Sequence, residues 1–156
     1  MAANTVVRGP GESDALWLLG GLYEIKVSSE DTDNACTVIQ FTIPDGSGPP
    51  PHVHNCDELV YVLEGKARFH ADGETFEAGS GTVVNFPQGT EETFEPIGHV
   101  KLLTVYTPGG MDRFFKEAGE PARERELPPP SDAQPDFERL GAIAEKHGLQ
   151  LKVPVG

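Results

Sequence analysis

Short runs of alternating apolar and polar residues, separated by glycine and proline, fill most of the chain up to Tyr106. Within residues 36–43 the side chains of Ile39, Phe41 and Ile43 fall on one face, which predicts a strand whose more apolar face points inward. Similar runs predict strands at 15–19, 21–27, 52–54, 59–63, 66–70, 75–78 and 100–106. About eight short strands with Gly/Pro turns are typical of an antiparallel double-sheet jelly roll, so we expect an all-β fold.

The run Leu59–Leu63 is apolar on both of its faces, which predicts a central strand covered on both sides. Glu64 and Gly65 are then expected to turn the chain into the strand at 66–70. The following segment, residues 71–74, contains Asp-Gly and predicts a hairpin turn.

Helical patterns begin only after the strands. Residues 112–119 predict a short helix, with Asp112 as its cap and Gly119 as its end. Residues 120–135 are rich in proline and charge and predict an extended linker, and residues 136–148 predict a second short amphipathic helix. We therefore expect a β-barrel with an N-terminal arm in residues 1–120 and a Pro-rich linker with a short C-terminal helix in residues 121–156.

Composition excludes several kinds of partner. The 156 residues are enough for one domain, and 25 acidic against 12 basic residues give a formal net charge of −13. This charge repels nucleic acids and anionic membranes. The N-terminus lacks the pattern of a signal peptide and no apolar run approaches the ~20 residues that cross a bilayer, so we expect a cytoplasmic protein. Cys36 and Cys56 are expected to be reduced thiols, although one bridge remains open.

The main chemical signal is His52-Val-His54 followed by Glu58. Two histidines one residue apart on an extended segment project to the same side, because side chains alternate across a strand. Two imidazoles and one carboxylate are a ligand set that leaves open positions on a transition metal. The pattern therefore predicts a metal site.

The spacing G-x5-H-x-H-x3-E-x6-G, formed by Gly46, His52, His54, Glu58 and Gly65, resembles the first conserved motif of the cupin superfamily. The resemblance implies the cupin form of the jelly roll, the double-stranded β-helix barrel, with a metal held by the two histidines and Glu58. We expect one divalent transition metal, which could be Fe, Mn, Ni, Zn or Cu, because ligand type alone does not select among them.

Residues 81–96 look like the second cupin motif, with Gly81, Pro87 and Gly89 in place. The family's fourth ligand is a histidine, and its position is taken here by Glu92. Three interpretations of Glu92 stay open: it is a fourth metal ligand, it is a carboxylate at the rim of a three-ligand site, or the site has lost its metal. Without metal, the buried Glu58 and Glu92 would repel each other, and one of them is expected to hold a proton.

Residues 106–119, the Pro-rich segment and the closing helix are similar to single-domain, quercetinase-like cupins. This resemblance implies a dioxygenase acting on an enolic aromatic such as a flavonol or a polyketide, with Glu58 as both metal ligand and catalytic base. Inward-facing apolar residues are candidates for substrate binding, although each is also an ordinary core residue: Ile39, Phe41, Val60, Val62 and Phe94. Cys56 lies between His54 and Glu58, and we interpret it as a packed thiol and not as a ligand.

Two other functions remain open. The same site could act as a Lewis acid in a redox-neutral cyclisation or isomerisation that needs no O2. The chain could also be a barrel that binds a small molecule without changing it. Cupin relatives are often dimers, and the strand at 59–63 is apolar enough to take part in a homodimer.

Overall fold

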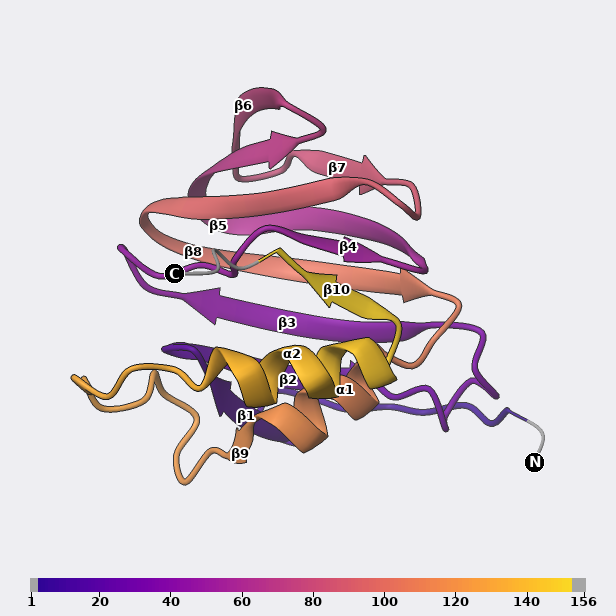
Figure 1. Ribbon diagram of the computed structural model, residues 1–156. Helices are drawn as coiled ribbons and strands as arrows, with labels where there is room; N and C mark the ends of the chain where they lie inside the picture. Colours follow the sequence, from indigo (N-terminus) through magenta and orange to yellow (C-terminus); the bar gives the residue numbers. More distant parts are fainter. Residues whose placement is uncertain (1–2, 153–156) are drawn as a thin grey trace.

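The computed structural model describes residues 3–152. Strands are the main regular structure of the described chain, and two short helices follow near its C-terminal end (Figure 1). The elements are β1 (Asp14–Leu18), β2 (Gly21–Val27), β3 (Thr37–Ile43), β4 (His52–His54), β5 (Asp57–Ala71), β6 (Glu74–Gly79), β7 (Val83–Phe86), β8 (Glu91–Thr107), α1 (Met111–Ala118), β9 (Glu120–Pro121), α2 (Phe137–Lys146) and β10 (Leu149–Leu151). The predicted all-β jelly roll is confirmed.

The long strands β5 and β8 connect the two halves of the sheet. In the order β10-β4-β8-β3-β2-β1-β9, β8 pairs with both β4 and β3, while β5 pairs with β6, β7 and β8. All the pairings in this sheet are antiparallel. Because β8 holds β4 at its start and β5 along its length, residues of three different strands meet inside the barrel.

Strand β5 is continuous where the sequence predicted a turn at Glu64 and Gly65. Its register against β8 shifts between Val62 and Glu64 and again after Gly65, so the chain bends and stays in the sheet. Gly65 has φ 79°, and a Cβ atom there would overlap the carbonyl oxygen of His99. The glycine is therefore required for the close approach of β5 and β8 at this bend.

The prediction that residues 59–63 are covered on both sides is wrong. Val60 and Val62 are buried at 2% and 0% exposure, whereas Leu59 and Tyr61 are 38% and 41% exposed. The neighbours β7 and β8 lie beside β5 within the sheet, and no further described layer shields the outer face at this position. The sheet therefore has one buried face and one exposed face here.

Helix α1 closes one end of the barrel through aromatic contacts. The ring of Phe115 lies 4.7 Å from that of Tyr23 and 5.8 Å from that of Phe41. Gly119 ends the helix as predicted, but the N-cap is Gly110, and Asp112 lies in the first turn. The buried Asp112 carboxylate instead accepts hydrogen bonds from Ser29 and Thr37, which fasten the helix to the strands.

The C-terminal part returns to the barrel. Helix α2 is capped by Asp136, whose side chain accepts a hydrogen bond from the backbone N–H of Arg139, and it buries Leu140 and Ala144. Strand β10, which the sequence analysis did not predict, then pairs with β4 (Figure 1). Neither helix within residues 3–152 is long and apolar enough to cross a membrane.

Candidate metal centre

Three strands bring four side chains to one point inside the barrel. His52 and His54 lie on β4, Glu58 lies near the start of β5, and Glu92 lies near the start of β8. Alternation along β4 buries both imidazoles while Val53 stays half-buried. In the antiparallel register His52 is directly opposite Glu92, so strand pairing delivers the fourth side chain.

The four side chains are close together and shielded from solvent. One nitrogen or oxygen atom from each lies within 4.8 Å of those of the other three. The Nε2 atom of His54 is 2.8 Å from a carboxylate oxygen of Glu58, and the Nε2 atom of His52 is 3.4 Å from a carboxylate oxygen of Glu92. All four residues are at most 8% exposed. Glu92 therefore lies within the cluster and not at an exposed rim.

The backbone before β4 orients the first imidazole. The Nδ1 atom of His52 lies 2.9 Å from the carbonyl oxygen of Pro50, which can only accept a hydrogen bond. Nδ1 is therefore the protonated nitrogen, and the lone pair of Nε2 faces the cluster. An imidazole with this arrangement is ready to coordinate a cation.

Several buried polar atoms of the cluster have no hydrogen-bond partner. They are both ring nitrogens of His54 and one carboxylate oxygen of Glu58. Although His54 and Glu58 are close, the contact lacks the alignment of a hydrogen bond. Buried polar atoms without partners are costly, and a divalent cation among the two imidazoles and two carboxylates would satisfy one ring nitrogen of His54 and the oxygen of Glu58. The residues present therefore fit a metal ion.

Burial and the charges nearby give the two carboxyl groups different pKa values. Burial raises the pKa of Glu92 well above its ordinary value, and the negative charge of Glu58 raises it further. Burial acts in the same direction on Glu58, but the neighbouring His54 and His52 outweigh it and hold the pKa of Glu58 below its ordinary value. Without a cation, the pair therefore keeps one proton on Glu92, in keeping with two carboxyl groups that share one buried site.

A cavity of about 60 Å³ adjoins the cluster. Phe41 and Phe94, two of the predicted substrate-binding residues, line it. The other three, Ile39, Val60 and Val62, are fully buried core residues that do not border it. They lie further along the inward faces of β3 and β5, where core side chains fill the interior.

The structure adds cavity residues that the sequence analysis did not select. Tyr106 is opposite Glu58 in the pairing of β5 with β8, and its ring lies 5.3 Å from that of His54. Burial, with the charges of Glu58 and Glu92, raises the pKa of Tyr106 well above its ordinary value, so its phenol stays neutral. The inward alternation of Leu102, Thr104 and Tyr106 was visible in the sequence, but the residue opposite Tyr106 was not. Further lining residues come from the closing segments: Leu18, Leu19, Met111, Phe114, Phe115, Leu140, Leu149 and Leu151.

Cys56 is not one of the four clustered residues. It is 4% exposed, and burial together with the nearby Glu58 raises the pKa of its thiol to about 12. Cys36 and Cys56 are both free. A buried neutral thiol of this kind packs as a small apolar group.

Comparison with known proteins agrees with this geometry. Residues 39–106 match the family model described as "Cupin domain". The chain is 27% identical over 146 residues to the quercetin 2,3-dioxygenase of Bacillus subtilis, an alignment that covers 92% of this chain and 42% of that protein. The chain thus spans about two fifths of the length of this relative.

Solved structures share the fold at low sequence identity. An RmlC-like cupin from Shewanella frigidimarina superposes with a TM-score of 0.64 and 14% identity, covering 72% of this chain and 99% of that chain. The polyketide cyclase RemF from Streptomyces resistomycificus superposes with a TM-score of 0.60 and 18% identity, covering 85% and 89%.

A jelly roll that gathers two histidines and two glutamates from β4, β5 and β8 has the architecture of the cupins, a class of β-barrel proteins. Together with the family match, it identifies residues 39–106 as a cupin domain. More narrowly, the chain is similar to a quercetinase among the curated proteins, which supports the resemblance that the motifs carry.

Replacing either histidine of the cluster should remove the metal. We expect His52→Ala and His54→Ala each to lower bound metal below about a tenth of the wild-type content, because each loses a ligand from a buried site. Elemental analysis of protein purified without chelator measures this, with His70→Ala as a control, since His70 lies on the exposed outer surface. Wild-type metal content in either cluster variant would refute the assigned site.

The substitution Glu92→Ala tests whether Glu92 is a fourth metal ligand. We expect metal affinity to fall by more than about tenfold, because Glu92 faces His52 inside the cluster and a direct ligand matters at least as much as an outer-shell partner. Competition with a chelator measures the affinity. The neighbouring Glu91→Ala, exposed on the same strand, is the matched control. Unchanged affinity for Glu92→Ala would mean that only three side chains hold the metal.

Proposed function

We propose that this cupin is a metal-dependent oxygenase, a dioxygenase acting on an enolic aromatic such as a flavonol or a polyketide. The observation that carries the proposal is the buried cluster of His52, His54, Glu58 and Glu92 beside an apolar cavity. The similarity to a quercetin 2,3-dioxygenase over 92% of the chain supports the substrate class.

Each residue of the site would have a separate role in the reaction. A bound divalent metal supplies Lewis acidity that lowers the pKa of a substrate hydroxyl. Glu58, held ionised by its histidine neighbours, is the base that accepts the hydroxyl proton. His52 keeps its Nε2 lone pair directed into the site through its contact with Pro50. The enolate is electron-rich at carbon, and O2, the oxidant that the proposed reaction consumes, would place both of its oxygen atoms in the product while Glu58 returns the proton.

Apolar side chains around the cluster would protect this chemistry from water. Phe41, Phe94 and Phe114 line the cavity, and the neutral Tyr106 closes the side next to His54. A low-dielectric wall strengthens the attraction between an enolate and nearby positive charge. It also limits hydrolysis of reactive species formed from the substrate.

A redox-neutral cyclase or isomerase is the second candidate. The observation in its favour is that His52, His54, Glu58 and Glu92 gather beside a small apolar cavity, so a metal held there could polarise an enolic substrate as a Lewis acid without any need for O2. A barrel that only binds its ligand is the third candidate.

Oxygen consumption separates these candidates. With metal-loaded protein and the flavonol quercetin, we expect O2 uptake that stops under anaerobic conditions. Glu58→Gln should lower kcat by about 10² or more, because the amide keeps the shape but does not accept the proton. An oxygen electrode and substrate absorbance measure both effects, and elemental analysis shows whether the variant keeps its metal.

The other possible results of these assays would each contradict a part of the proposal. Product formation that continues without O2 would contradict the oxygenase and favour the redox-neutral enzyme. Binding without any change in a panel of enols, by protein with its full metal content, would favour the binding barrel. A Glu58→Gln variant that keeps both metal and full activity would remove Glu58 from the role of base.

We also propose that the chain forms a homodimer through the outer face of β5 and β7. Leu59, Tyr61 and Val83 are exposed there, and Tyr61 and Val83 are direct cross-strand neighbours. We expect a dimer in light scattering and a shift to monomer for Tyr61→Glu, because a charge would be placed in an apolar contact. Ile97→Glu, at another exposed apolar residue, is the control. A monomeric wild-type chain would contradict the proposal.

A further inference from the structure

The cavity beside the metal cluster is too small for an aromatic substrate. Its volume is about 60 Å³, whereas a cavity known to bind one benzene ring has roughly 150 Å³. Ligand pockets for drug-sized molecules usually have roughly 300–1,000 Å³. If the proposed oxygenase acts on an aromatic, only the reacting edge of the substrate fits inside the barrel.

A much larger space lies directly outside. It has a volume of about 1,030 Å³ and is bordered by Leu18 and Leu19, by the loop 44–50, and by the Pro-rich segment 127–135. We name this space the proline groove. Leu18, Leu19, Pro49 and Pro50 border both the proline groove and the metal cavity, so the two spaces adjoin. The carbonyl oxygen of Pro50 also orients His52, so the boundary between the two spaces lies next to a residue of the metal cluster.

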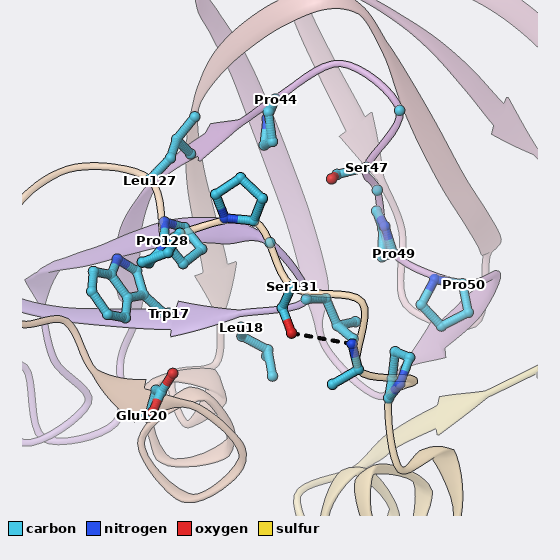
Figure 2. A pocket seen from close by; sticks show the side chains of 18 of the residues that line it. Trp17, Leu18, Pro44, Ser47, Pro49, Pro50, Glu120, Leu127, Pro128 and Ser131 are labelled. Carbon is cyan, nitrogen blue, oxygen red and sulfur yellow. Dashed lines mark hydrogen bonds between the residues drawn. The ribbon is translucent and has the colours of Figure 1, made fainter.

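The walls of the proline groove suit flat apolar rings. Seven of its lining residues are prolines, which come from two segments far apart in the sequence. Figure 2 shows Pro49 and Pro50 on one side and Leu127 and Pro128, beside Trp17, on the other. Proline rings are rigid, so such walls lose little conformational entropy when a ligand packs against them.

Trp17 holds the Pro-rich wall in place. Its indole N–H donates a hydrogen bond of 2.8 Å to the carbonyl oxygen of Glu126, immediately before the wall begins. The guanidinium group of Arg123 lies 5.2 Å from the centre of the indole ring, within the range of a cation–π contact. At the other end of the wall, α2 is anchored by the buried Leu140. The groove is therefore part of the fold and not a gap beside a loose tail.

The charges around the proline groove limit the kind of ligand that it can bind. The only ionisable side chains that border the groove within the described residues are Glu120 and Arg123, and Arg123 already lies over Trp17. The chain as a whole carries a formal charge of −13, which disfavours anionic ligands. A neutral ligand with a few hydroxyl groups fits the remaining polar side chains, Ser47 and Ser131.

We infer that the proline groove binds the body of the substrate, a neutral planar aromatic of several rings, while only its enolic edge enters the metal cavity. This inference rests on the proposed function, because the groove gains its role from the adjoining metal site. It makes substrate size a specificity determinant: a molecule with several rings spans groove and cavity, and a single ring gains little from the groove.

Trp17 is the only tryptophan of the chain and therefore reports on binding. Metal-free protein should show saturable quenching of Trp17 fluorescence by the three-ring flavonol quercetin. The one-ring probe catechol should bind at least about tenfold more weakly, a difference of about 1.4 kcal/mol. Isothermal titration calorimetry checks both affinities independently of fluorescence. Because this binding is measured without metal or turnover, it is separate from the tests of the metal site and of O2 uptake.

Two substitutions fill the groove from opposite walls. Ser47→Phe and Ser131→Phe should each weaken quercetin binding at least about tenfold, because the added ring occupies the space of the ligand, and both should keep the wild-type metal content. Ser80→Phe, exposed in the turn before β7 and outside the groove, is the matched control and should bind as the wild type does. Circular dichroism establishes that each variant is folded.

The inference is overturned if folded Ser47→Phe and Ser131→Phe bind quercetin as tightly as the wild type, or if the wild type consumes quercetin while binding it no better than catechol. Loss of the metal site or of oxygen uptake, with groove binding intact, would instead contradict the proposed function. The two failures are therefore distinguishable.

Discussion

Two buried carboxyl groups, Glu58 and Glu92, face each other across two imidazoles, and this arrangement constrains the whole interior of the barrel. Like charges in a low-dielectric site are unfavourable unless a proton or a cation compensates them. Burial and the charge of Glu58 raise the pKa of Glu92, which favours a proton on that carboxyl group when no metal is present. The unpartnered nitrogens of His54 show that a proton alone does not satisfy the cluster.

The rest of the structure shields this cluster from solvent and fixes the distances between its side chains. Pairing of β4 with both β8 and β10 fixes the strand that carries the histidines. The bend at Gly65 lets β5 follow β8 closely along its length. Helices α1 and α2 close the barrel with Phe114, Phe115 and Leu140. Consequently the space left beside the four clustered side chains is small, and the larger space that adjoins it is the proline groove.

Much of the architecture was predictable because it depends on local patterns. Alternation of apolar residues predicted β1, β2, β3 and the second half of β8, and the Asp72-Gly73 turn predicted the hairpin of β5 and β6. The helix at 112–119 was predicted from its terminal glycine and the helix at 136–148 from its apolar stripe. Strand β10 was missed, because three residues are too few for a periodic signal and its pairing with β4 is not local.

The sequence by itself determined the jelly roll and the placement of His52, His54 and Glu58 on one side of the chain, because alternation along a strand and glycine turns are local properties. The tertiary structure alone decided that Glu92 joins them, since strand register is set by long-range pairing. It also decided that Tyr61 is exposed, that Ile39, Val60 and Val62 are core, and that distant prolines form one groove. Burial and enclosure depend on what packs across the barrel, which an apolar pattern along one strand does not specify.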